Sequence, residues 1–230
     1  MKLKKIASLA LAGIMAVSML AGCKDGTSQE DPSSSSQVPA TTNVVTYAND
    51  ALSGAEKGVF TFKSSSELDT ALQSAANNKN KLSSGEIENI YKDNISVAKW
   101  AGDDDSQDGA LYDVLSAVKG KISGIVEEDL KTAAPDDGKS QKALDVYAIS
   151  GAVNEKVAVE KVISLFNQGE TEINNTNYPN AAKNSDYIYT YSAEISAVKV
   201  ASADKTDNTV WVVAIVVTQT ATEAANANSN

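Results

Sequence analysis

The acidic run Asp103–Gly109 contains the residues whose spacing is most suggestive of metal chemistry. Asp104, Ser106 and Asp108 stand at alternate positions and a glycine is sixth, as in the first half of a calcium-binding loop. The twelfth position is Leu115, where such a loop needs a bidentate glutamate. The run therefore has two interpretations: a calcium site, or a solvated acidic loop that ends in a helix N-cap.

Three tyrosines form a second candidate site. Tyr187, Tyr189 and Tyr191 alternate, so in a strand they share one face and could stack on a sugar or a peptide. The same face continues through Ala193 and Ile195, which favours the alternative that it packs on a helix. The sequence leaves both a ligand-binding platform and a core face open.

Paired carboxylates are the third kind of candidate. They occur at Glu86 with Glu88, at Glu127–Asp129 and at Asp136–Asp137. Glycoside hydrolysis needs two carboxyl groups that face each other across a cleft, one of them with a raised pKa. Linear spacing identifies no such pair here, so no catalytic residue is assigned and a carboxylate-based glycan hydrolase is kept as an alternative function.

The residues that the chain lacks exclude several functions. It has 20 basic residues, all lysine, no histidine and 30 acidic residues, for a net charge of −10. Nucleic-acid binding needs basic surface, usually with arginine, so no nucleic-acid partner is expected. Zinc sites are built mainly from His and Cys, and nucleophilic serine or cysteine usually needs a histidine base. Carboxylate chemistry, calcium and plain binding remain.

The single cysteine ends an apolar segment near the amino terminus. Three lysines within residues 1–5 precede the apolar run Ile6–Leu20, whose length is typical of a signal peptide and too short for a membrane span. The following Leu20–Cys23, of sequence LAGC, resembles the lipobox of bacterial lipoproteins. That resemblance implies cleavage before Cys23, a diacylglycerol on its sulfur, and a lipid anchor on the extracytoplasmic face of the cell membrane.

The composition divides the chain after this site. Residues 1–22 are expected to be the signal peptide, and residues 23–43 the lipidated cysteine with a flexible Ser/Thr/Pro tether. Removing 1–22 takes away three lysines and no acid, which leaves 17 − 30 = −13. Residues 44–220 are expected to form one globular domain, and residues 221–230 a loose polar tail.

Hydrophobic periodicity predicts helices first and strands later within that domain. The β-prone pieces are Val44–Tyr47 and Val59–Phe62, and Ser64 with Glu67 is expected to cap a helix through Ala75. A second helix is expected over 83–98 and a third from Asp108 to Val126. A strand at 146–153 and an Asn154-capped helix at 155–168 should follow.

The end of the domain predicts the fold class. Strands are expected at 187–200 and 209–220, and the second contains the run VWVVAIVV, which is apolar on both faces. Such a run is typical of the middle of a sheet that is covered on both sides. We therefore expect an α+β fold in which an antiparallel sheet is sandwiched between helices (α/β/α).

The order of these elements is similar to the bacterial branch of the CAP superfamily, also called SCP domains. The pieces that carry the resemblance are the early helical segment Leu68–Ala75, Asp108–Leu115, Asn154–Gln168 and the terminal strand Val210–Gln219. It implies an α/β/α sandwich with a groove on one side. The family's groove histidines are missing, so no functional residue is carried over, and the resemblance implies binding rather than catalysis.

The sequence thus predicts a lipid-anchored extracytoplasmic protein. Its expected role is non-catalytic binding of a cell-wall glycan or a protein partner at the cell surface, with no cofactor other than the calcium considered above. The alternatives are the carboxylate-based glycan hydrolase and a calcium-stabilised adhesin module.

Overall fold

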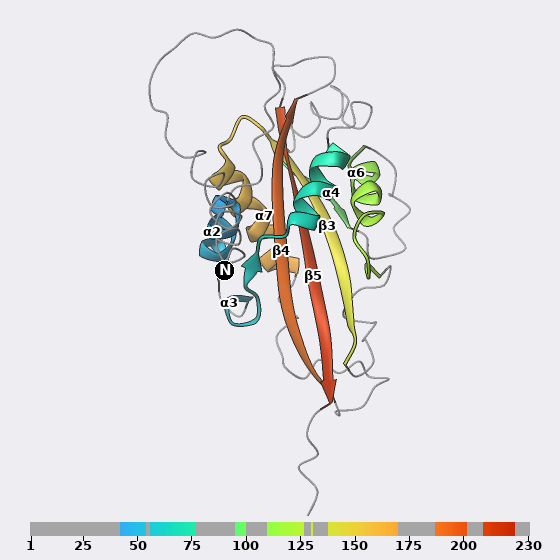
Figure 1. Ribbon diagram of the computed structural model, residues 1–230. Coiled ribbons are helices and arrows are strands. Elements are labelled where there is room, and N and C mark those ends of the chain that lie inside the picture. Colours follow the sequence, from blue (N-terminus) through green and yellow to red (C-terminus); the bar gives the residue numbers. More distant parts are fainter. Residues whose placement is uncertain are drawn as a thin grey trace, which may run out of the picture. The chain divides into compact units, whose positions relative to one another are not determined.

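The longest apolar run of the chain forms the centre of a five-stranded sheet. The structure, a computed structural model, describes residues 42–53, 56–76, 95–99, 110–126, 130, 138–169, 187–201 and 209–223 (Figure 1). The strand order is β1–β4–β5–β3–β2. The strands are β1 (Phe62–Lys63), β2 (Ile95–Lys99), β3 (Ser140–Ser150), β4 (Tyr187–Ala201) and β5 (Thr209–Glu223).

Strand β5 lies between its two longest neighbours, as its composition predicts. It pairs antiparallel with β4 from Thr209↔Ala201 to Glu223↔Tyr187, and antiparallel with β3 from Val210↔Ser150 to Thr220↔Ser140. Its side chains from Val212 to Val217 are buried on both faces. The predicted central position is therefore confirmed.

The sheet is mixed at one edge. Strand β1 runs parallel to β4, with Phe62 opposite Ala193, whereas β2, β3, β4 and β5 pair antiparallel. The predicted antiparallel pairing holds for β2, β3, β4 and β5, and the parallel β1 departs from it, because β1 belongs to the amino-terminal part of the chain and joins the sheet beside the distant β4.

Helices cover both faces of the sheet, which confirms the predicted α+β class. The described helices are α2 (Thr42–Ala51), α3 (Glu56–Val59), α4 (Ser66–Ala76), α6 (Ala110–Lys119) and α7 (Glu155–Gly169). Helices α4 and α6 pack on one face, and α2 and α7 on the other (Figure 1). The strands extend beyond the helices at the end where β5 finishes (Figure 1).

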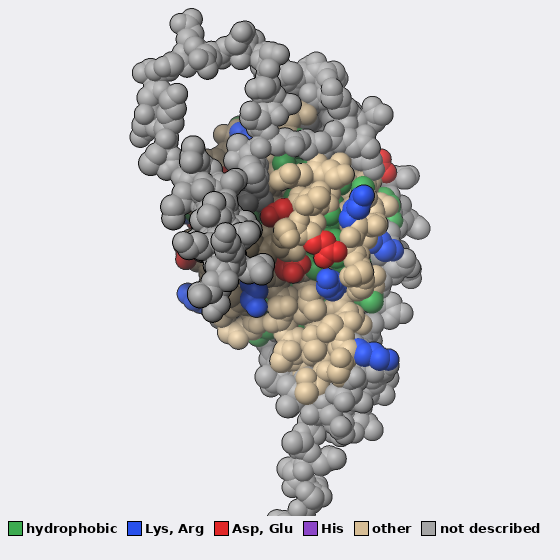
Figure 2. All heavy atoms as spheres, in the orientation of Figure 1, with side chains coloured by type: hydrophobic (Ala, Val, Ile, Leu, Met, Phe, Trp, Pro, Cys, Tyr) green, Lys and Arg blue, Asp and Glu red, His purple; other side chains and the backbone are tan. Residues whose placement is uncertain are grey.

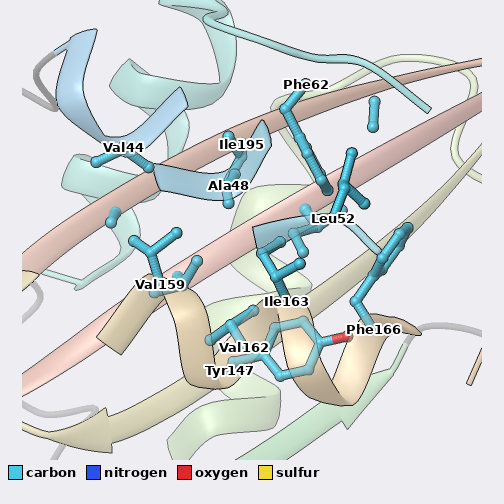
Figure 3. Close-up of a cluster of buried hydrophobic side chains, with 14 of the residues drawn as sticks. Val44, Ala48, Leu52, Phe62, Tyr147, Val159, Val162, Ile163, Phe166 and Ile195 are labelled. Carbon is cyan, nitrogen blue, oxygen red and sulfur yellow. The ribbon is translucent and has the colours of Figure 1, made fainter. Parts of the chain in front are cut away.

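The two faces of the sheet bury separate apolar cores because side chains alternate along each strand. Leu68 and Leu72 of α4 and Val114 of α6 contact the even-numbered residues of β3, β4 and β5. The odd-numbered residues contact α2 and α7, and Figure 3 shows this second core. There, Phe166 meets the rings of Phe60 and Phe62 edge-on, with centroids 5.2 Å and 5.6 Å apart.

Helix α7 begins where the sequence predicts. The side chain of Asn154 accepts a hydrogen bond from the backbone N–H of Val157 at 2.9 Å, which satisfies a donor that the first turn leaves unpaired. Ala158, Val159, Val162 and Phe166 are buried at helical spacing. The predicted N-cap and core face are both confirmed.

The segment after the expected tether is a helix, and the predicted strand at 44–47 is wrong. Val44, Ala48 and Leu52 recur every four residues and are all buried in the core beside α7, as Figure 3 shows. This helical spacing outweighs the β propensity of the valines once there is a partner to pack against. The helix also includes Thr42 and Asn43, so the expected tether boundary is two residues too late.

The folded domain extends beyond its predicted end at residue 220. Strand β5 continues to Glu223, and Ala221 is fully buried with its N–H donating to the Lys139 carbonyl at 3.1 Å. The expectation of a loose tail from residue 221 is therefore wrong for residues 221–223. The small size of Ala221 allows it to pack in the sheet.

Three further element predictions differ from the structure. The cap of α4 is Ser65, whose Oγ accepts from the Leu68 N–H at 3.3 Å, rather than Ser64. The helix expected over 83–98 is wrong for Ile95–Ala98, which belong to β2; the rest of that segment lies outside the described residues. The helix expected from Asp108 to Val126 is α6, which ends at Lys119 instead of Val126. Gly124 then turns the chain with φ of 82°.

Among the described helices, none has both the length and the apolar character needed to cross a membrane.

Candidate functional site

Most residues with predicted chemistry lie outside the described part of the chain. These are Cys23, the acidic-loop residues Asp104, Ser106 and Asp108, and the carboxylate pairs at residues 86, 88, 127–129, 136 and 137. Within the described residues, no group of three or more His, Cys, Asp or Glu side chains is placed to hold a metal ion. The calcium interpretation of the acidic loop stays a prediction.

The tyrosine face is built into the core at the two positions whose side chains are described. Tyr189 is 3% exposed, and Tyr191 is half-buried with its ring 5.9 Å from that of Phe60. The expected stacking platform therefore does not hold at Tyr189, which presents no ring face to a ligand. Tyr187 lies in β4, and its side chain is outside the description.

A row of buried amides continues from Tyr191 across the sheet. Gln219 Nε2 donates to Tyr191 Oη at 2.9 Å, and Gln141 Nε2 donates to Gln219 Oε1 at 2.7 Å. The three residues stand opposite one another in the register of β4, β5 and β3. The Gln219 side chain is fully buried, so these bonds satisfy polar groups that could not reach water.

The opposite side of the same sheet end carries hydroxyl groups. Two register rows cross β3, β5 and β4 there: the first joins Ser140, Thr220 and Thr190, and the second joins Lys142, Thr218 and Ser192. Alternation places both rows on the side of α4 and α6. We call these six residues the hydroxyl face.

The hydroxyl face remains accessible because it lies beyond the helical layer. Ser140 and Thr190 are exposed, and the other four side chains are partly exposed. Figure 2 views this side of the molecule and shows the lower end of the described sheet as mostly uncharged polar side chains and backbone. Ser140 Oγ and Thr220 Oγ1 are 2.7 Å apart and hydrogen-bonded, which orients neighbouring hydroxyls along the first row.

Two carboxyl groups in the described part have raised pKa values, which is the property expected of a catalytic acid. Partial burial raises the pKa of Asp69 in α4 and that of Glu155 in α7. The hydroxyl of Ser196 is close enough to Asp69 to lower its pKa in part. That hydroxyl makes no well-formed hydrogen bond to a described residue, so desolvation prevails.

These two carboxyl groups cannot act as a catalytic pair. Asp69 is on α4, on one side of the sheet, and Glu155 is on α7, on the other side. A glycosidase needs its two carboxyl groups to face each other across the substrate. Their raised pKa values therefore reflect local burial and not a shared site.

Comparisons with known proteins return no match: no family model fits this sequence, and neither curated proteins nor solved structures are similar to it.

The hydroxyl face is not among the sites that the sequence predicts. The signal was present in TQTAT at 218–222, where threonine alternates directly after the apolar run. Residues 221 and 222 fall in the predicted tail, although they belong to β5 and continue its alternation. The face also requires the registers of β3 and β4 against β5, which sequence spacing does not supply.

Proposed function

We propose that this chain is a lipid-anchored extracytoplasmic protein that binds a component of the cell envelope without catalysing a reaction. The observation that carries the proposal is the sequence LAGC at residues 20–23, which follows a basic and then an apolar segment. A thioether-linked diacylglycerol on Cys23 would hold the folded part beside the membrane, and a second acyl group would make the attachment stable.

Support for binding comes from the surface of the described domain. The hydroxyl face combines five neutral hydroxyl groups with one lysine, on a chain whose net charge is −10. The carboxyl groups with raised pKa lie on separate sides of the sheet, which removes the pair that the hydrolase alternative would use in this part of the chain. A binding role needs only the exposed face.

A binding survey combined with a turnover assay tests the role. The full chain, purified in mild detergent, is incubated with polysaccharide and protein fractions of the cell envelope, and both bound protein and released reducing sugar are measured. The proposal predicts binding to at least one fraction with no release of sugar. Absence of binding together with release of sugar would replace it with the hydrolase.

A further inference from the structure

We propose that the hydroxyl face binds an uncharged polysaccharide of the cell envelope, laid across strands β3, β5 and β4. This inference rests on the proposed function and names the partner of the binding surface. The two register rows of the hydroxyl face bring together five hydroxyl groups and one ammonium group that are separated in sequence by as many as 80 residues (Ser140 to Thr220).

The charge of the face selects a neutral partner. Lys142 is the one charged side chain among its six residues, whereas the whole chain carries 30 acidic residues and a net charge of −10. A polyanion would be repelled by the field of the chain, and a single lysine cannot offset that repulsion. A polycation would meet the lysine, and the nearest carboxylate on this side of β4 is the single Glu194 in the next register row.

The side chains of the face differ from those at the centre of a protein interface. The centre of a protein interface is normally enriched in aromatic residues, Met and Arg, and binding energy concentrates in a few such anchors. The hydroxyl face holds none of these residue types. In the described structure, the nearby Tyr189 and Tyr191 lie on the opposite side of the sheet, within the core.

The arrangement of the hydroxyls suits a partner that is itself a chain of hydroxyls. Each Ser or Thr hydroxyl donates one hydrogen bond and accepts two, as sugar hydroxyls do. In a sheet, the groups repeat at about 7 Å along each strand and about 4.8 Å between strands. An extended sugar polymer can therefore contact several hydroxyls at once without ordering any long side chain.

Such contacts are weak one by one because water competes for each hydrogen bond. Attachment at Cys23 would compensate for this weakness. A protein held beside the polymer is at a high effective concentration, so repeated weak contacts give useful occupancy. This reasoning predicts low affinity for short oligosaccharides and higher affinity for long chains.

Isosteric loss of the hydroxyls tests the inference. The variant carries Thr190→Val, Thr218→Val and Thr220→Val, which remove three hydroxyls, keep the side-chain shape and preserve β propensity. Thr46→Val is the matched control, because Thr46 is an exposed threonine on α2, on the other side of the sheet. The probe is the neutral polysaccharide fraction of the cell's own envelope, protease-treated and coupled to beads, with the acidic fraction in parallel.

The expected result is binding of the wild type and the control to the neutral fraction, with at least tenfold weaker binding by the triple variant. Each hydrogen bond lost weakens binding about threefold to tenfold, and three hydroxyls are lost. Circular dichroism and thermal melting establish that the triple variant is folded. If it is not, Ser192→Ala, which removes one hydroxyl, is measured instead, and at least a threefold loss is expected.

Four results would overturn the inference. Binding to the acidic fraction alone, binding to the neutral fraction only when protease treatment is omitted, or equal binding by the folded variant would each assign the partner to another class or another surface. Any of these three leaves the proposed binding function standing. Binding to no envelope fraction at all would reject both the inference and the proposed function.

Discussion

The buried amide row offers the most exacting test of how this sequence specifies its sheet. Gln219 sits in the central strand with no exposed surface, between Gln141 at 2.7 Å and Tyr191 at 2.9 Å. Replacing Gln219 with Leu preserves approximate volume and removes both hydrogen bonds. At about 1 kcal/mol for each bond and more for the buried groups that lose their partner, we expect a loss of about 2–4 kcal/mol.

The expected loss of stability in Gln219→Leu has a second cause, which is the composition of β5. Most of this strand is apolar on both faces, so a slip of two residues against β3 or β4 would still bury valines. Gln219 is the residue that makes the observed register preferable, because only this register places it between Gln141 and Tyr191. A buried polar group that fixes register is a well-attested use of such residues.

Urea unfolding followed by circular dichroism measures the effect. Gln141→Leu and Tyr191→Phe serve as comparisons, because each removes one of the two bonds and leaves one atom of the buried Gln219 without that partner, which should cost about 1–3 kcal/mol. Amide hydrogen exchange along β5 then reports whether the register has loosened. If the free energy of unfolding of Gln219→Leu lies within about 0.5 kcal/mol of the wild-type value, and amide exchange along β5 is unchanged, the amide row neither stabilises the sheet nor fixes its register.

Two other substitutions have clear expected outcomes. The Gly151 N–H donates to the Thr209 carbonyl at 2.9 Å, and in Gly151→Ala the added Cβ would overlap the side chain and carbonyl of Thr209. Calorimetry should therefore show a free energy of unfolding that is lower by about 1–3 kcal/mol. An unchanged melting temperature would contradict this packing. Asp69→Asn should stabilise the protein at pH 7 by less than about 1 kcal/mol, because partial burial disfavours the charged form of this half-exposed carboxyl.

The pH dependence of the Asp69 variant follows from the direction of the pKa shift. Because the pKa is raised in the folded state, the native protein binds this proton more tightly than the unfolded chain. The contribution of the protonated group is complete below the ordinary value of 3.8 and is lost as pH rises through the raised pKa. The stabilisation by Asp69→Asn should therefore disappear in acid. A stabilisation that grows as the pH falls would be inconsistent with desolvation of the charged carboxyl.

The sequence was most informative where one strong local pattern dictates one environment. The two-sided apolar run of β5 required a covered central position, and Asn154 before an apolar helical stripe required a cap. It was misleading at Val44, where β propensity and helical spacing disagreed and packing against α7 decided. It also failed at Ala221, whose small side chain resembles that of a tail residue and yet fits the sheet.

The candidate site is harder to predict because it depends on how β3 and β4 align with β5. Tyr189 and Tyr191 were correctly placed on one face, but whether that face is covered depends on Phe60 and α7, which come from elsewhere in the chain. The hydroxyl face likewise exists only because β3 and β4 place Ser140 and Thr190 beside Thr220.

The proposed anchor is tested most directly by the intact mass of the protein from the membrane fraction of its own cells. A chain that begins at Cys23 and carries a diacylglycerol is the predicted result, and Cys23→Ala should move the protein out of that fraction. An unmodified chain that still begins at Met1, recovered from the cytosol, would contradict the account.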